Sequence, residues 1–424
     1  MHISGPIPPQ FGRLSNLIEL RLGRNSLTGS IPASLGNLHK IKTLVLNDNR
    51  FSGNIPSSLF QSMKSLSELH LEMNELSGPI PVSFANLTSL TYANLHSNRF
   101  SGKIPSFISE LVSLRYMQLS RNNLSGKLPN SIGKLPQLSS LGMAFNSITG
   151  PIPSSIGNLT GLSSLNLAYN KLTGPIPASI GNLKRLMWFT LRNNQLVGPL
   201  PPQLGNLTML SSLDLSYNPL RLTSIPNWIA DMRLWSLGLA GLGIQGNLPQ
   251  WLSSSSSFRH IDLSNNQITG QLPSWLENNK YLKTLKLANN RFNSSIPPEF
   301  KNLIDLETID LHSNNLSGCL KVIFDTKFPN LTHPIKVLNM ENTRISGSIP
   351  SELGNSNRLT TILLSNNNLN GSIPYEVLNL NTLQKFNVSR NELVGEIPSH
   401  TLSIPASAFS HNVGLCGAPL PPCK

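Results

Sequence analysis

The sequence predicts an α/β solenoid, in which about sixteen short strands form a parallel sheet on one concave face. Three observations point to this fold. A segment of 24 residues recurs along nearly all of the 424-residue chain, one position of the segment is almost always Asn, and leucines alternate just before that position. One such unit cannot cover its apolar face alone, whereas stacked units bury a continuous core.

The repeat is clearest when the chain is aligned on its asparagines. Sixteen equivalent positions run from Asn25 to Asn391, and thirteen of the fifteen steps between them are 24 residues long. Asn occupies fourteen of these positions, and the exceptions are Leu242 and Thr343. The unit reads L-x-x-L-x-L-x-x-N-x-L-x-G-x-I-P-x-x-L-G-N-L-x-x.

Each unit begins with a strand. In the stretch LSSLNLAYN, Leu165 and Leu167 are two residues apart, so both side chains point to the same face of a strand, which is the core face. Asn170 ends the strand, and its amide can bond backbone groups of its own turn and of the neighbouring coil. Repeated in every coil, this arrangement predicts a buried ladder of asparagines.

The rest of the unit returns the chain to the next strand. Gly174 permits a tight bend, and Pro177 blocks further strand pairing and can open a short helical turn. The segment ASIGNL then crosses the back of the coil. Four side chains of this path are expected to point into the core: Leu172, Ile176, Ile180 and Leu183.

At these residues the chain resembles a known family. Segments such as LTGPIPASIGNL and LSGPIPVSFANL resemble the plant-specific class of leucine-rich repeat, over essentially residues 1–398. The tail AFSHNVGLCGAPLPPCK resembles the C-terminal cap of plant receptor-like kinases and receptor-like proteins. The resemblance implies a right-handed leucine-rich-repeat superhelix with a second short strand around L-x-G-x-I-P. It also implies a cell-surface ectodomain in signalling, defence or development.

The resemblance and the repeat register together divide the chain into three parts. Residues 1–8 form a partial first repeat without an N-terminal cap, residues 9–398 form the solenoid, and residues 399–424 form the C-terminal cap. Family ectodomains begin with a signal peptide, and receptor kinases continue into a membrane helix and a kinase. The start MHISGPIPPQ has no apolar signal segment, and no run of about 18 apolar residues follows. We therefore expect a truncated gene model or fragment.

Cysteines and glycosylation motifs indicate an extracellular location. Cys416 and Cys423 are seven residues apart and are expected to form a disulfide, whereas Cys319 is left over as an unpaired structural thiol. Nine N-x-S/T motifs occur, partly because the repeat itself contains NLT and NLS. Those in the back segment are the expected glycosylation sites: Asn86, Asn158 and Asn206.

The outward positions of the strands are free to vary, so we expect them to carry the specificity of the protein. Six of them are aromatic and fall into two rows, in a chain that is only 6% aromatic. With two arginines suited to a ligand carboxylate, they form the predicted ligand-binding face: Tyr92, Tyr116, Arg121, Phe145, Tyr169, Trp188, Arg192 and Tyr217. The alternative is that these aromatic side chains only pack on one another between coils.

Charge is distributed unevenly over the predicted surfaces. The net charge is +13, but the outward strand positions carry eight acidic and seven basic residues. The excess positive charge therefore lies on the back and edges, which argues against a nucleic acid or another polyanion on the concave face and leaves open attraction of the back to acidic wall pectin. Asp262, Lys286 and Asp310 share one position on successive strands and predict a charge-neutralising ladder.

Several irregular segments carry weaker predictions. Gly241, Gly243 and Gly246 match a dinucleotide-binding pattern, but the repeat register explains them better. The step from Asn314 to Thr343 is 29 residues, which predicts a lengthened surface loop, and residues 253–257 predict a polar turn. No nucleophile elbow, phosphate loop or metal-ligand spacing appears, so we expect no enzyme, no metal and no cofactor.

Two functions remain open at this point. The first is a receptor-type ectodomain that binds a peptide or protein ligand, with or without a co-receptor. The second is a secreted inhibitor of a cell-wall hydrolase, similar to the polygalacturonase inhibitors of the same family.

Overall fold

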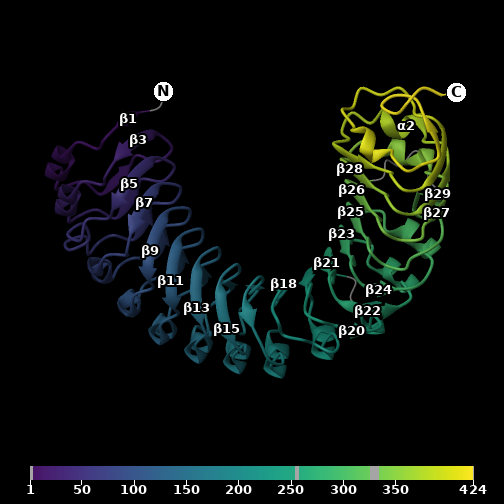
Figure 1. The fold of residues 1–424 in the computed structure, drawn as a ribbon. Helices are drawn as coiled ribbons and strands as arrows, with labels where there is room; N and C mark the ends of the chain where they lie inside the picture. Colours follow the sequence, from purple (N-terminus) through teal and green to yellow (C-terminus); the bar gives the residue numbers. More distant parts are fainter. Residues whose placement is uncertain (1–2, 254–256, 325–333, 424) are drawn as a thin grey trace. The chain divides into compact units, whose positions relative to one another are not determined.

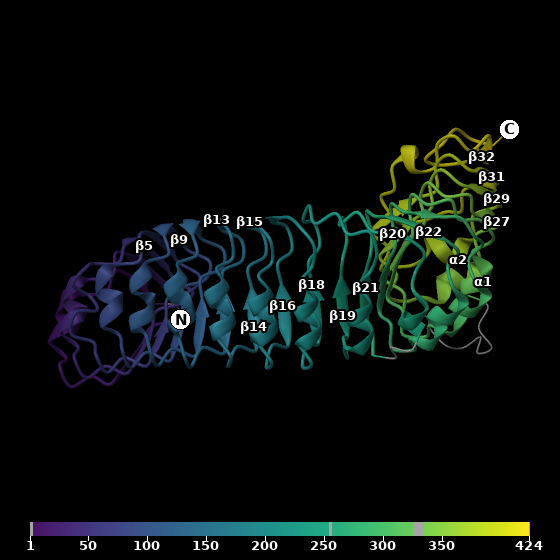
Figure 2. The same cartoon turned by 90° about the horizontal axis from the view of Figure 1, so that it is seen from below.

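The protein is described by a computed structural model that covers residues 3–253, 257–324 and 334–423. The chain divides into two compact units, Met1–Leu220 and Arg221–Lys424. Within each unit the chain winds through similar coils, and each coil adds one inner strand beside that of the coil before it (Figures 1 and 2). The predicted solenoid and its sixteen inner strands are confirmed. The predicted domain boundaries at residues 8 and 398 stay a prediction.

The inner strands of the first unit form a parallel sheet with a 24- or 25-residue register, as in the pairing of Leu141 with Leu165. They are β2 (Glu19–Arg21), β4 (Thr43–Val45), β6 (Glu68–His70), β8 (Tyr92–Asn94), β10 (Tyr116–Gln118), β12 (Ser140–Gly142), β14 (Ser164–Asn166), β16 (Trp188–Thr190) and β18 (Ser212–Asp214).

A second row of strands follows the asparagine turn, as the resemblance implied. In the first unit these strands are β1 (Ser4–Gly5), β3 (Ser26–Gly29), β5 (Arg50–Asn54), β7 (Glu75–Gly78), β9 (Arg99–Lys103), β11 (Asn123–Lys127), β13 (Ser147–Gly150), β15 (Lys171–Gly174) and β17 (Gln195–Leu196).

Short 3-10 helices form the outer side of the first unit, opposite the inner strands (Figure 1). Most begin directly after the repeat proline, because proline fixes an extended entry and then permits a helical turn. They are η1 (Pro9–Arg13), η2 (Ala33–Asn37), η3 (Val82–Asn86), η4 (Ser106–Glu110), η5 (Asn130–Lys134), η6 (Ser154–Asn158), η7 (Ala178–Asn182) and η8 (Pro202–Asn206).

The second unit repeats the plan with more variation. Its inner strands are β19 (Ser236–Gly238), β21 (His260–Asp262), β23 (Thr284–Lys286), β25 (Thr308–Asp310), β26 (Val337–Asn339), β28 (Thr361–Leu363) and β30 (Lys385–Asn387). Its second row comprises β20 (Gln245–Gly246), β22 (Gln267–Gly270), β24 (Arg291–Phe292), β27 (Ser346–Gly347), β29 (Asn368–Gly371), β31 (Glu392–Glu396) and β32 (Gly414–Cys416). The helices are η9 (Asn227–Asp231), η10 (Gln250–Ser253), η11 (Ser274–Asn278), η12 (Pro298–Asn302), α1 (Lys321–Phe324), η13 (Ser351–Asn355), α2 (Tyr375–Leu378) and η14 (Ala406–Ala408).

The core lies between the strands and the outer helices of each coil. Leu165 and Leu167 are fully buried, as the two-residue spacing predicts. The four predicted core residues of the return path, Leu172, Ile176, Ile180 and Leu183, are at most 3% exposed.

The asparagine ladder ties each coil to the one before it. The Asn170 Nδ2 donates to the carbonyl oxygens of Leu167 and Ala168 in its own turn and to that of Met143 in the preceding coil, at 2.9–3.2 Å. Its Oδ1 accepts the backbone N–H of Ile148, also in the preceding coil. One buried amide therefore bonds four backbone groups in two coils, and the neighbouring ladder asparagines share two of its acceptors.

Both exceptions to the ladder keep part of this network. The Thr343 hydroxyl lies within hydrogen-bond distance of two acceptors, the Met340 carbonyl oxygen and Asn367 Oδ1, and can donate to either. At Leu242 the amide is lost, and Asn266 of the next coil accepts the N–H groups of both Leu242 and Ile244. Gly241, which precedes Leu242, has a φ of 68°, so this glycine serves the turn of the repeat.

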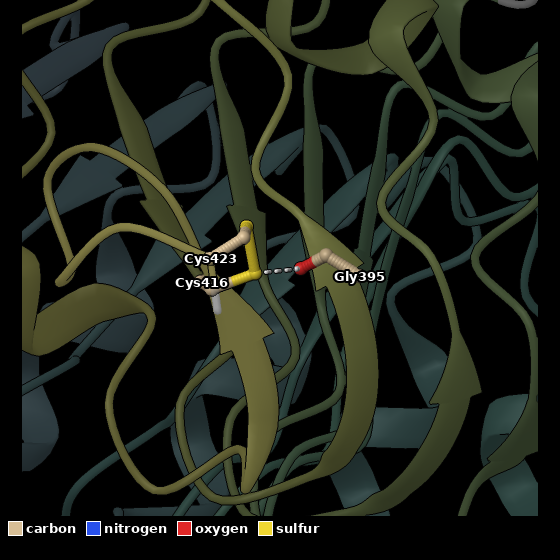
Figure 3. The surroundings of a disulfide bond; sticks show 3 residues. All are labelled: Gly395, Cys416 and Cys423. Atoms are coloured by element: carbon tan, nitrogen blue, oxygen red, sulfur yellow. Dashed lines mark hydrogen bonds between the residues drawn. A yellow bond between two sulfur atoms is a disulfide. The ribbon is translucent and has the colours of Figure 1, made fainter.

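The C-terminal segment ends the second unit with a disulfide. Cys416 lies in β32, which pairs with β31, and is joined to Cys423 (Figure 3). The Cys416 Sγ is 3.6 Å from the Gly395 carbonyl oxygen, which is a contact rather than a hydrogen bond because a disulfide sulfur carries no hydrogen. Cys319 is a free, half-buried thiol.

Some predictions fall outside the described residues. Most of the lengthened loop, including the Asn330 motif, lies in 325–333, and the polar turn at 253–257 is described only at its two ends. Among the helices that the structure describes, none has the length and apolar character needed to cross a membrane.

Candidate ligand-binding face

The residue before each ladder asparagine has a left-handed backbone. Arg121, Phe145 and Tyr169 have φ values of 56°, 55° and 54°, and the same conformation recurs in nearly every coil. Asn and Gly tolerate it best, yet this stretch of the first unit places large side chains there. The sequence prediction missed this conformation, although the Asn at positions 193, 265, 289, 342 and 366 was a signal for it.

Three of these large side chains stack along the first unit. The Phe145 and Tyr169 rings lie 4.2 Å apart between centroids and within 9° of parallel. The Arg121 guanidinium lies over the other face of the Phe145 ring, 4.7 Å from the ring centroid. Phe145 is 42% exposed and Tyr169 is 38% exposed, so the stack is also a surface. The packing between coils and the exposed aromatic face are therefore the same feature.

Arg192 extends this line toward β18. Its guanidinium lies 4.7 Å from the Tyr217 ring centroid and 3.4 Å from an Asp214 carboxylate oxygen. Burial acts to lower the pKa of Arg192, but the Asp214 carboxylate and the Tyr169 hydroxyl outweigh it and raise the pKa above its ordinary value. The Arg192 guanidinium is thus fixed by these contacts, and the Asp214 carboxylate neutralises part of its charge.

The other predicted row contains a second stack. The Tyr92 and Tyr116 rings are 4.4 Å apart and parallel within 2°, on strands β8 and β10 that pair directly. His70 stacks on the far face of Tyr92 at 4.6 Å, which the sequence prediction did not include. Burial, with Tyr116 and the Glu72 carboxylate, raises the pKa of Tyr92 to about 12.

Trp188 stands apart from this second stack. It is 45% exposed and pairs through β16 with Ser164 and Ser212. Because Ser140 and Ser164 occupy the same position between Tyr116 and Trp188, the row is interrupted by small polar side chains. The predicted residues thus form two stacks and one isolated tryptophan on the inner face of one unit.

The inner face of the second unit is mainly polar. Asp262, Lys286 and Asp310 are neighbours in register on β21, β23 and β25, as the sequence predicts. The Asp310 Oδ1 lies 2.6 Å from His312 Nδ1. Within the described chain, no group of three or more His, Cys, Asp or Glu side chains is placed to hold a metal ion.

The three predicted glycosylation sites lie on the outer side of the first unit. Asn86, Asn158 and Asn206 are the last residues of η3, η6 and η8, and all three are exposed. Asn387, by contrast, lies on β30 and is half-buried, with its Nδ2 bonded to Glu341.

Comparison with known proteins places the chain in a family. A model of a leucine-rich repeat region matches residues 96–217, and one leucine rich repeat model matches 41–100 and 249–316. A second leucine rich repeat model matches 16–38, 209–232, 334–356 and 358–380. The Arabidopsis receptor kinase HAESA, solved with the peptide hormone IDA and the co-receptor SERK1, is 31% identical, with a TM-score of 0.67. The match covers 99% of this chain and 81% of HAESA. This chain belongs to the leucine-rich-repeat family of plant receptor ectodomains.

Further matches agree with this membership. The HAESA ectodomain with an N-terminally extended IDA peptide gives 31% identity and a TM-score of 0.70, over 100% of this chain and 82% of that one. The Arabidopsis thaliana ectodomain of GASSHO1/SCHENGEN3, solved with CASPARIAN STRIP INTEGRITY FACTOR 2, is 30% identical with a TM-score of 0.66. The match covers 99% of this chain but only 61% of that ectodomain. Sequence comparison with curated proteins gives no match. The chain thus has the fold of ectodomains that are solved in complex with peptide ligands.

Proposed function

We propose that this chain is the ligand-recognising part of a plant cell-surface receptor and that it binds an extended peptide on the inner face of its first unit. The supporting observation is the exposed line formed by Arg121, Phe145 and Tyr169, continued by Arg192 and Tyr217. Its members lie on five successive coils, so the line runs across the strands, in the direction that an extended chain can follow.

The chemistry of this line suits a peptide. Flat aromatic faces give contact area at little cost in side-chain entropy, and they accept proline rings and aliphatic side chains. Arg121 is exposed, and within the described residues its guanidinium is placed only against the Phe145 ring, so its N–H groups are available to a ligand carboxylate. Similar ectodomains are known in complex with peptides: HAESA with IDA, and PEPR1 with AtPEP1.

Glycans on Asn86, Asn158 and Asn206 are part of this proposal. All three lie on the outer side of the coils, so sugars there leave the inner face open. Peptide mapping of protein from a plant secretory host, before and after enzymatic glycan release, tests their occupancy.

The binding test uses a peptide selected on the protein itself. A randomised peptide library is enriched on the whole chain, and the affinity of the strongest binder is then measured by calorimetry. Phe145→Ala and Tyr169→Ala together are expected to weaken binding about tenfold or more, because central aromatic contacts often carry 2 kcal/mol or more. Tyr281→Ala with Tyr375→Ala is the matched control, since these tyrosines are 61% and 62% exposed and lie in the second unit.

Two outcomes would remove the proposal. Equal affinity of wild type and the Phe145/Tyr169 variant would show that the aromatic line only packs between coils. Inhibition of a purified endopolygalacturonase by the wild-type chain, with no peptide enriched, would favour the alternative of a hydrolase inhibitor.

A further inference from the structure

A groove on one edge of the first unit is lined by three basic side chains. It has a volume of about 490 Å³ and lies among the segments that lead from the outer helices to strands β10, β12, β14 and β16. Arg115 lies at one end of this series of coils, and Lys184 and Arg185 lie at the other. At the usual spacing of ~4.8 Å between neighbouring strands, the two ends are roughly 14 Å apart along the sheet.

The positive charge of the groove is not compensated locally. All three basic side chains are exposed, and none of the described residues that line the groove is acidic. Neither Arg115 nor Arg185 takes part in an ion pair within the described chain, and the Lys184 ammonium donates only to the Asn206 carbonyl, at 3.2 Å. The strand positions of the inner face, in contrast, carry nearly equal numbers of acids and bases. The groove therefore concentrates part of the +13 net charge of the chain.

Three exposed polar side chains also line the groove. Gln137 and Thr160 line the coils between the basic ends, and Asn182 lies two residues before Lys184; all three side chains can donate and accept hydrogen bonds. This pattern matches the hydroxyl groups of a sugar chain. No aromatic side chain lines the groove in the described structure, so nothing is present there for nucleic acid bases to stack on. A single small anion reaches only one of the two basic ends.

We propose that this groove binds an acidic polysaccharide, whose carboxylates pair with Arg115 at one end and with Lys184 and Arg185 at the other. The site is separate from the proposed peptide face, although Tyr116 follows Arg115 directly in the chain. Thr160 also completes the Asn158 glycosylation motif, so a glycan on Asn158 would lie beside the groove.

The test measures binding of an oligogalacturonate of about ten sugars to the whole chain, at low and moderate salt. All versions carry Asn158→Gln so that variable glycosylation beside the groove does not affect the comparison. The groove variant combines Arg115→Glu, Lys184→Glu and Arg185→Glu. The control variant combines Lys103→Glu, Lys127→Glu and Lys171→Glu, which make the same change in net charge on the second row of strands. Thermal unfolding checks that each variant is folded.

We expect wild type and the control variant to bind within about twofold of each other, and the groove variant to bind at least about tenfold more weakly, because its charge-assisted contacts become repulsive. A neutral galactan of the same length is expected not to bind. An equal loss of binding in both variants would overturn the proposal, since it would reduce the effect to net charge. Equal affinity for polyglutamate would also overturn it, in favour of an acidic peptide, as would full competition by stoichiometric inorganic phosphate.

A second measurement covers the case in which the groove variant does not fold. In the wild-type chain, oligogalacturonate is expected to slow the chemical acetylation of Lys184 and to leave that of Lys127 and Lys171 unchanged. Uniform protection of all three lysines, or of none, contradicts the proposed site.

Discussion

The rings of Tyr92 and Tyr116 lie parallel within 2° at 4.4 Å, although 24 residues separate them in the chain. Their strands pair in register, so the stack reports directly on the contact between two neighbouring coils. Offset parallel rings of this kind contribute about 0.5–1.5 kcal/mol beyond their buried area. A double-mutant cycle with Tyr92→Ala and Tyr116→Ala is expected to give a coupling in that range in urea unfolding. A cycle that pairs Tyr92→Ala with Tyr281→Ala should give none.

The same tyrosine gives the protein a specific alkaline sensitivity. Burial raises the pKa of Tyr92 from 10.0 to about 12. A group whose pKa is raised by folding stabilises the fold below its unfolded pKa, and that stability is lost as the pH rises toward the folded value. Wild type is therefore expected to lose more unfolding free energy than Tyr92→Phe between pH 10 and about 12. At neutral pH, the difference in unfolding free energy between wild type and Tyr92→Phe gives the part that does not depend on ionisation.

The ladder asparagine is expected to be costly to replace. In Asn170→Ala, the buried backbone N–H of Ile148 loses its partner, and the carbonyl oxygens of Met143, Leu167 and Ala168 each lose one of two hydrogen bonds. An unsatisfied buried polar group costs about 1–3 kcal/mol, and urea unfolding should show a loss of at least that size. Asn158→Ala, at an exposed helix end, should change the unfolding free energy by less than about 0.5 kcal/mol. Similar losses of unfolding free energy in both variants would mean that the buried ladder bonds stabilise the fold no more than an exposed asparagine does.

Met73 offers the opposite case, a position where a substitution should stabilise the protein. It precedes the ladder residue Asn74 with a φ of 56° and is 50% exposed, and none of the described rings stacks upon it. A left-handed backbone costs most residues about 1–2 kcal/mol, and Asn pays less. Met73→Asn is expected to raise the unfolding free energy by roughly 0.5–1 kcal/mol. An unchanged or lowered midpoint in urea would show that the methionine side chain compensates through its contacts.

The Glu307 carboxylate is expected to make a small contribution to the free energy of unfolding that is lost in acid. Its carboxylate is 2.7 Å from the Lys336 ammonium and 3.3 Å from that of Lys283. The hydrogen bond from Lys336 lowers the pKa of Glu307 below its usual 4.5. A lowered pKa stabilises the fold above the unfolded value, and the effect disappears as the pH falls through the folded value. Glu307→Gln is expected to cost about 0.2–1 kcal/mol near neutral pH and nothing in strong acid, as measured by urea unfolding.

The sequence predicted the features that every coil shares. Leu165, Asn170 and Pro177 each have one physical role, and the structure gives each of them that role. Such positions are predictable because period and residue type alone determine them. The second strand row and the C-terminal disulfide pair also follow from the printed residues and the family resemblance.

The contacts on the ligand-binding face were less predictable. Alternation places Tyr92 and His70 on one side of the sheet but says nothing of their rotamers, so the stacking of His70 was missed. The placement of Arg192 over Tyr217 likewise depends on Asp214. After β18 the repeat loses its second strand at residues 219–223, where Pro219 removes a backbone donor. The division of the array into two units falls at this irregular stretch.

The short sequence span of each asparagine's hydrogen bonds affects how the number of repeats can evolve. Asn170 bonds only its own turn and the coil before it. The side-chain hydrogen bonds that join two coils at a ladder position therefore involve residues within about 27 positions of each other. Duplicating or deleting one whole 24-residue period therefore joins equivalent surfaces and leaves the asparagine hydrogen bonds between the remaining coils intact. Array length is thus free to change by recombination of whole periods, and the 25-residue step to Asn74 shows that a small insertion between two ladder positions also leaves the amide network intact.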